Sequence, residues 1–273
     1  MADKPLIAIT GASSGIGEAT ARAFSAAGHP VLMMARRVDR MEAMNLPDSV
    51  IAQVDVRDRA QIADAVARAE AQYGPVDMMF ANAGLARLAD IGRQPPEEWD
   101  EMIDINTKGV MNTVHAVMNA MMERRHGTLV MMSSIAGRKV YPDHTVYCGT
   151  KFFVHAVSES LREYLSDYNV RVLVVSPGVI ETEVLTGVLD EKTLREYKEN
   201  KVRMGGGIGP WVVGYIVDRT GSYDAGWLVC AGVTAAAVPL FLLAGPPMEL
   251  IAHYRREAEG EFAEVHTLLA DRV

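Results

Sequence analysis

The sequence has little of several features that mark particular classes of protein. Of its 273 residues only two are cysteines, and 7% are aromatic. Two cysteines do not make a disulfide framework, so we expect a reducing compartment. The seven histidines stand apart without the spacing of metal ligands, and we therefore expect no metal site. The apolar run near the N-terminus is too short for a signal peptide, which predicts a cytoplasmic protein.

Positive charge is also sparse. Lysine and arginine together number 27 against 35 aspartates and glutamates, which gives a net charge of −8. The arginine pairs at 36–37, 124–125 and 255–256 are far apart, with no basic stripe and no interleaved aromatic residues. Nucleic acid is therefore not an expected partner.

Short apolar runs alternate with helical patterns over the first two-thirds of the chain. The expected strands are 6–10, 31–34, 50–54, 76–81, 128–132 and 170–175. The expected helices include a long one over about 97–120 and another from Tyr147 to about Tyr168. Strict alternation of helices with mostly apolar strands predicts an α/β fold, a doubly wound parallel sheet with helices on both faces.

A glycine-rich turn joins the first expected strand to the helix that follows it. The turn reads Gly11-Ala12-Ser13-Ser14-Gly15-Ile16-Gly17. Glycines there permit a tight turn and close approach of the backbone, while the helix N-terminus offers free amides to a pyrophosphate. The turn predicts a dinucleotide site; the alternative is a tight strand–helix connection that binds nothing.

The end of the second expected strand indicates which dinucleotide is bound. NAD-dependent proteins usually place an acidic residue there for the ribose 2′-hydroxyl, whereas this chain has Arg36 and Arg37. A guanidinium pairs well with a 2′-phosphate. NADP(H) is therefore the predicted cofactor, with two ordinary surface arginines as the alternative.

Tyr147 and Lys151 stand four residues apart in an expected helix, and Ser134 precedes the tyrosine by thirteen residues. Positions i and i+4 share a helix face, so the ammonium lies beside the phenol and favours the phenolate. A hydroxyl from a separate segment could hold a substrate oxygen against that phenol. The pattern indicates acid/base chemistry, although the same spacing also occurs on ordinary solvated helices.

Together these motifs have the order and spacing found in the short-chain dehydrogenase/reductase family, which the chain resembles from residue 5 to about 204. The motifs are Thr10-Gly11-x-x-x-Gly15-x-Gly17, Asn82-Ala83-Gly84, Asn106, Ser134, Tyr147-x-x-x-Lys151 and Pro177-Gly178-x-x-x-Thr182. The resemblance implies a Rossmann-type fold and hydride transfer between NADP(H) and a small alcohol or carbonyl substrate. It also implies a homo-oligomer, because similar helices pair into dimers and tetramers in that family.

The resemblance further implies roles for individual residues. Tyr147 is similar to the family's proton donor and acceptor, and Lys151 to its partner, which also holds the nicotinamide ribose. Ser134 is similar to the serine that binds the reacting oxygen, and Asn106 to the asparagine that anchors a water. The remaining implied cofactor contacts are Asp55 and Val56 at the adenine, Asn82, Ala83 and Gly84 at the adenosine ribose, and Pro177, Gly178, Ile180 and Thr182 at the nicotinamide.

Each of these assignments has an alternative. Ser134 could merely end a strand, the two asparagines could cap helices or satisfy buried backbone, and Asp55 could be the N-cap of the next helix. A protein with the same fold could also bind NADP without catalysis, as a sensor or partner-binding module. Substrate determinants are expected over residues 84–93, 135–145 and 185–204.

The C-terminal part departs from this resemblance. Residues 205–245 resemble, more weakly, the last helices of major-facilitator transporters, and 225–245 are 21 residues without a charge, long enough to span a membrane. We therefore expect a dinucleotide-binding catalytic domain over 1–204 and an atypical segment over 205–273. Two interpretations of that segment stay open: it completes the sheet with a last helix and strand, or it enters a membrane and tethers a cytoplasmic enzyme.

Overall fold

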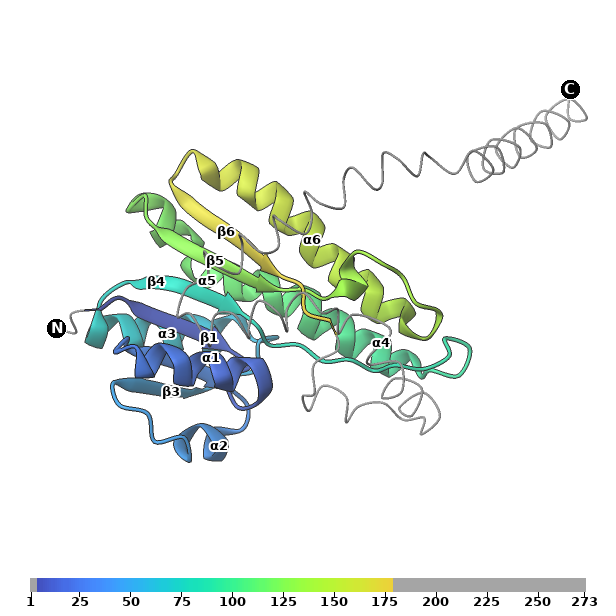
Figure 1. Cartoon of the computed structure of the whole chain (residues 1–273), viewed down its shortest axis with the longest axis horizontal. Coiled ribbons are helices and arrows are strands. Elements are labelled where there is room, and N and C mark those ends of the chain that lie inside the picture. The colour runs from blue at the N-terminus through green and yellow to red at the C-terminus, as the bar shows by residue number, and fades with distance from the viewer. Residues whose placement is uncertain (1–3, 179–273) are drawn as a thin grey trace, which may run out of the picture. The chain divides into compact units, whose positions relative to one another are not determined.

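A six-stranded parallel sheet organises the part of the chain that the computed structural model describes, residues 4–178 (Figure 1). The strands are β1 (Leu6–Thr10), β2 (Val31–Ala35), β3 (Ser49–Gln53), β4 (Val76–Ala81), β5 (Gly127–Met132) and β6 (Val170–Val175). Their order across the sheet is β3-β2-β1-β4-β5-β6, with every neighbouring pair parallel. The chain therefore begins in the middle of the sheet, moves to one edge, and returns to build the other half. This is the predicted doubly wound arrangement.

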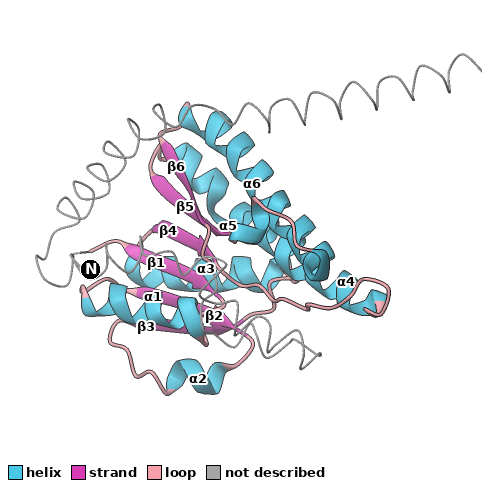
Figure 2. Ribbon diagram, turned by 45° about the vertical axis from the view of Figure 1, so that its right-hand side comes forward, coloured by secondary structure: helices cyan, strands magenta, loops and turns pink. Residues whose placement is uncertain are grey.

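Helices cover both faces of this sheet (Figure 2). They are α1 (Gly15–Ala26), α2 (Val38–Glu42), α3 (Arg59–Tyr73), α4 (Pro96–Ile103), a π-helical turn η1 (Asp104–Lys108), α5 (Gly109–Glu123) and α6 (Thr145–Ser166). Two 3-10 turns, η2 (Ile135–Gly137) and η3 (Pro142–His144), precede α6. One apolar cluster contains residues of α1 and α2, and another contains residues of α3, α5 and α6.

Strand β1 shows why the central strands are mostly apolar. All five of its residues are buried. Because successive side chains point to opposite faces, Leu6 and Ala8 join the cluster under α3, α5 and α6, while Ile7 and Ile9 join the one under α1 and α2. A strand buried on both faces needs no polar alternation.

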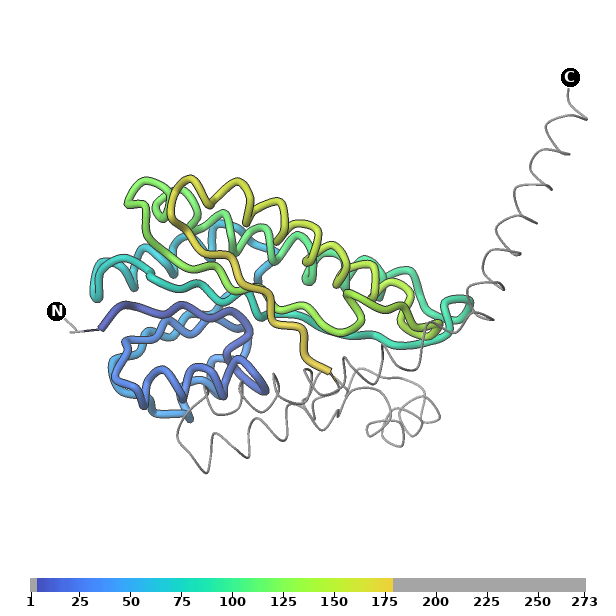
Figure 3. The backbone as a smooth tube through the Cα atoms, turned by 45° about the horizontal axis from the view of Figure 1, so that its top comes forward, coloured from blue at the N-terminus to red at the C-terminus, as the bar shows by residue number. Residues whose placement is uncertain are grey.

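The two halves of the sheet meet along β1 and β4, where the order of the strands reverses (Figure 3). The turn after β1 and the loop after β4 both start at the carboxyl ends of these two neighbouring strands. In open parallel sheets this reversal makes a crevice in which ligands bind. The topology alone therefore places a site between these two connections.

The predicted strands agree with the structure to within one residue at each end, and the predicted helix over 97–120 lies within an uninterrupted helical run over 96–123 that contains one π turn. This π turn, η1, lies between α4 and α5. The physical reason is Asn106 in that turn, whose side chain is buried and hydrogen-bonds the backbone of Leu85. A wider turn at a functional position is a known departure from the α-helical repeat.

Several predictions fall outside the described residues. These are the domain boundary near residue 204, the atypical segment 205–273 with its uncharged stretch 225–245, and the sites at Ile180 and Thr182. Within residues 4–178, no helix is both long enough and apolar enough to cross a membrane.

Candidate active site

A pocket opens at the carboxyl ends of the strands, at the reversal point between β1 and β4. Most of the residues predicted as site residues and described by the structure line it. These are Gly11, Ser13, Ser14, Gly15, Ile16, Arg36, Arg37, Asp55, Val56, Asn82, Ala83, Gly84, Ser134, Tyr147, Lys151, Pro177 and Gly178. Gly17 and Asn106 do not line the pocket. They lie behind it, Gly17 against Gly11 and Asn82, and Asn106 against Leu85.

The glycine turn is shaped by close backbone contacts. Gly11 and Gly15 have φ angles of +67° and +57°, a region that favours glycine. A Cβ on Gly17 would lie 2.3 Å from the carbonyl oxygen of Gly11 and 2.6 Å from Nδ2 of Asn82. That amide in turn donates to the carbonyl oxygen of Thr10 at 3.0 Å. The turn and the loop after β4 are thus built together, and only glycine fits where they touch.

The end of β2 places two guanidinium groups beside this turn. Arg37 donates to the hydroxyl of Ser13 through Nε and Nη2, at 3.3 and 3.2 Å, and to the hydroxyl of Ser14 at 2.8 Å. Arg36 lines the same end of the pocket. Two hydroxyls, two cations and the N-terminus of α1 form a donor set that suits phosphate oxygens.

Asp55 follows β3 and lies beside the end of β2, where the N–H of Val54 donates to the carbonyl oxygen of Ala35. Its carboxylate is paired with Arg57, whose Nη2 lies 2.6 Å from Oδ2. The hydrogen bond from Arg57 holds the pKa of Asp55 below its usual value, against the opposing effect of burial. The alternative that Asp55 caps the next helix is wrong, because the N-cap of α3 is Asp58, which accepts from the backbone N–H of Ala60 at 2.9 Å.

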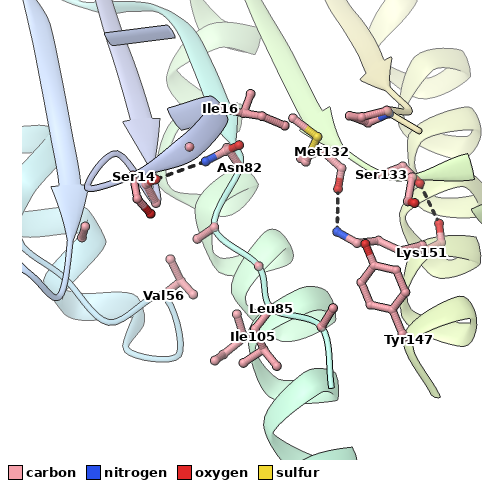
Figure 4. A pocket seen from close by; sticks show the side chains of 18 of the residues that line it. Ser14, Ile16, Val56, Asn82, Leu85, Ile105, Met132, Ser133, Tyr147 and Lys151 are labelled. Carbon is pink, nitrogen blue, oxygen red and sulfur yellow. Dashed lines mark hydrogen bonds between the residues drawn. The ribbon is translucent and has the colours of Figure 1, made fainter. Parts of the chain in front are cut away.

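Three predicted catalytic residues, Ser134, Tyr147 and Lys151, line the pocket, and Figure 4 shows the side chains of Tyr147 and Lys151 next to each other. Ser134 follows β5 and begins η2, where its Oγ accepts from the backbone N–H of Ala136 at 3.1 Å. Lys151 is only 4% exposed, and its Nζ donates to the carbonyl oxygen of Met132 at 3.1 Å. That Nζ is 5.6 Å from the centroid of the Tyr147 ring. Burial lowers the pKa of Lys151 to about 8.

Asn106 is fully buried behind this group. Its Oδ1 accepts from the backbone N–H of Leu85 at 2.9 Å, and its Nδ2 donates to the Leu85 carbonyl oxygen at 2.8 Å and to Oγ1 of Thr150 at 3.1 Å. A Cβ on Gly84 would lie 3.1 Å from Oδ1 of Asn106 and 3.5 Å from Nζ of Lys151. Asn106 thus hydrogen-bonds the backbone of Leu85, which is the structural role given above as the alternative to catalysis. It does so at a position close to Lys151.

The sequence did not single out several residues that surround the tyrosine. His144 is 5% exposed, lines the pocket, and has Nδ1 2.6 Å from Oδ1 of Asp143. Its ring centroid lies 5.2 Å from that of Tyr141 and 6.2 Å from that of Tyr147. Ala86 and Leu88 form a small apolar cluster against Tyr147. The only available signal was position, since His144 and Tyr141 fall in the stretch 135–145 expected to hold substrate determinants.

Comparison with known proteins agrees with this geometry. A family model described as short chain dehydrogenase matches residues 5–193. The chain is 36% identical over 197 residues to an uncharacterised oxidoreductase of Staphylococcus saprophyticus, covering 70% of this chain and 80% of that protein. It is 37% identical over 201 residues to the NADP-dependent 3-hydroxy acid dehydrogenase of Salmonella typhi, covering 71% and 81%.

The fold of this chain is similar to that of a solved structure described as the closed form of serine dehydrogenase complexed with NADP+. The TM-score is 0.66 and the sequence identity 35%, with 71% of this chain and 81% of that chain covered.

Proposed function

The chain belongs to the short-chain dehydrogenase family, and on that premise we propose that it is an NADP(H)-dependent oxidoreductase that interconverts a small alcohol and its carbonyl compound. One observation carries the proposal. Ser134, Tyr147 and Lys151 line one end of a pocket whose other end is made by the glycine turn and two arginines. Relatives whose names state NADP dependence, or that were solved with NADP+, support the choice of cofactor.

The donor groups of the pocket suit the successive parts of this cofactor. The turn at 11–17 and the N-terminus of α1 would hold the pyrophosphate. Arg36 and Arg37, with Ser13 and Ser14, would hold the 2′-phosphate. Lys151 would bind the nicotinamide ribose. When bound, the nicotinamide supplies a hydride to the carbonyl carbon or takes one from the alcohol.

The chain's own residues handle the proton. Tyr147 gives a proton to the substrate oxygen during reduction and takes it back during oxidation, while the Ser134 hydroxyl holds that oxygen in place. The ammonium of Lys151 stabilises the phenolate that remains after proton donation. Because burial brings the pKa of Lys151 to about 8, the lysine can both hold and release a proton near neutral pH.

Replacing Tyr147 with phenylalanine tests the assignment. Tyr147→Phe removes the proton donor and keeps the ring that packs on Ala86 and Leu88. We expect turnover of NADPH with a panel of small carbonyls to fall by about 10²–10⁴-fold, with NADPH affinity nearly unchanged. Undiminished turnover in the variant would defeat the catalytic assignment. Wild-type protein that binds NADPH and reduces no carbonyl would favour the alternative of a non-catalytic NADP-binding sensor.

We also propose that the protein forms homo-oligomers through α4, α5 and α6. These helices expose large apolar side chains: Ile103 is 40% exposed, Met111 36% and Phe152 40%. Light scattering is expected to give the mass of a dimer or tetramer, and Phe152→Asp to lower it, because a carboxylate is costly to bury unpaired. A monomeric wild type, or a variant of unchanged mass, would contradict this assembly.

A further inference from the structure

His155 connects the catalytic helix to the segment that follows β6. It lies on α6 one helical turn after Lys151, and its Nε2 is 3.1 Å from Oγ of Ser176. Ser176 directly precedes Pro177 and Gly178, both of which line the pocket. The bond therefore joins the helix that supplies the catalytic pair to the chain that forms one wall of the site.

Two backbone hydrogen bonds flank this side-chain bond. The N–H of Ser133 donates to the carbonyl oxygen of Val175 at 2.8 Å, and the N–H of Ile135 donates to that of Pro177 at 3.0 Å. These bonds tie the segment after β6 to the segment after β5, within the layer of the sheet. The bond to His155 ties the same segment to the helix layer, and so opposes its rotation about the two backbone bonds.

The imidazole occupies a closely packed place between η2 and α6. A Cβ on Gly137 would lie 2.7 Å from Cδ2 of His155, 2.6 Å from Oγ of Ser133 and 2.7 Å from the carbonyl oxygen of Lys151. The Ser133 hydroxyl also donates to that carbonyl at 3.0 Å. Only a glycine lets η2 approach the helix so closely, and the histidine ring is held between them.

The charge state of the ring suits this bond. Burial lowers the pKa of His155, Arg138 and Arg162 lower it further, and Glu159 opposes them. Because the usual pKa of histidine is about 6.5, the ring is neutral at neutral pH. A neutral imidazole with its proton on Nδ1 leaves Nε2 to accept a hydrogen bond from the Ser176 hydroxyl.

We propose that His155 is a positioning residue for Pro177 and Gly178, which it orients through Ser176. The inference rests on the proposed function, since these two residues lie where the nicotinamide end of NADP(H) would bind. Losing the bond loosens that wall while leaving the glycine turn and the two arginines, at the other end of the pocket, as they are. Binding of the nicotinamide end should therefore weaken and binding of the adenosine end should not.

Two probes separate the two ends of the pocket. NADPH reaches both, whereas adenosine 2′,5′-bisphosphate carries the adenosine and 2′-phosphate and has no nicotinamide. His155→Leu replaces the imidazole with an apolar side chain and removes the acceptor, and Ser176→Ala removes the donor. We expect each variant to bind NADPH about fivefold more weakly, as expected for one neutral hydrogen bond, and to bind the bisphosphate as tightly as the wild type. Isothermal titration of the full chain measures both affinities.

Coupling between the two side chains distinguishes a shared bond from two separate effects. The double variant should lose no more NADPH affinity than either single variant, because both remove the same interaction. His155→Gln, whose amide oxygen can accept from Ser176, should recover most of the affinity even if His155→Leu folds poorly. Ser160→Ala, an exposed change on the same helix, is the matched control and should behave as the wild type.

The outcomes that overturn the inference differ from those that overturn the proposed function. Wild-type NADPH affinity in His155→Leu and Ser176→Ala, multiplying losses in the double variant, or equal weakening of both probes would overturn the positioning role alone. A wild-type chain that binds neither NADPH nor the bisphosphate would overturn the proposed function as well.

Discussion

At the scale of the residue, Lys151 carries a charge where the fold leaves it almost no water. It is 4% exposed, and burial lowers its pKa from 10.5 to about 8. A difference of this size corresponds to about 3 kcal/mol by which the cofactor-free fold disfavours the charged form. The charge of Lys151 thus lowers the stability of the folded protein, at a site that is proposed to need a cation.

Replacing this lysine with an apolar side chain should therefore stabilise the protein while inactivating it. Below about pH 8 the lysine is charged in both the folded and the unfolded state, and the full cost applies. Between pH 8 and 10.5 the folded state loses the proton and the unfolded state keeps it, so stability rises with pH. Above 10.5 both forms are neutral. We expect cofactor-free Lys151→Met to be about 2 kcal/mol more stable at pH 7, after loss of the bond to Met132, with the gap closing towards pH 10.5.

Urea unfolding of the two proteins at a series of pH values measures this gap. A gap that does not change between pH 7 and 10.5 would mean that the charge of Lys151 is not the source of the cost. Turnover of the variant should be lost at every pH. Glu123, exposed near the end of α5, offers a control in Glu123→Gln, which should show no such pH-dependent gain.

At the scale of the element, the strands and the long helix were predictable, whereas the π turn inside that helix and the short helix α2 were not. A strand buried on both faces is a mostly apolar run, as in Leu6–Thr10, where prediction and structure agree residue for residue. The helix over 97–120 has unbroken helical periodicity, and nothing in the pattern marks the π turn within it. That turn follows from the hydrogen bonds that Asn106 makes with Leu85, a contact distant in sequence. The short helix α2 was missed because five residues are too few to show a period.

At the scale of the whole molecule, cofactor binding should appear as a gain in thermal stability. A ligand present at 100 times its dissociation constant stabilises the folded state by about 2.7 kcal/mol, or about 5–10 °C for a domain of this size. NADPH should raise Tm by this amount, and NADH at the same concentration by much less, because Arg36 and Arg37 face the 2′-phosphate end of the proposed site.

The variant Arg36→Ala sharpens this measurement. Without ligand, the Tm of the variant should match that of the wild type. The difference between the Tm increase caused by NADPH and that caused by NADH should become smaller, because a charged hydrogen bond to the phosphate contributes about 1.5–3 kcal/mol. Equal loss of the gain for both nucleotides would mean that Arg36 does not distinguish them.

The sequence by itself determined the class of fold, the strand positions and most of the pocket. Apolar periodicity, the glycines at 11–17 and the spacing of Ser134, Tyr147 and Lys151 are local patterns, and local patterns are readable without coordinates. Tertiary structure decided what depends on segments far apart in the chain. Such contacts are the hydrogen bonds of Arg37 with Ser13 and Ser14, of Asn106 with Leu85, and of His155 with Ser176. No local pattern specifies them, because their partners become neighbours only when parallel strands bring the ends of distant segments to one edge of the sheet.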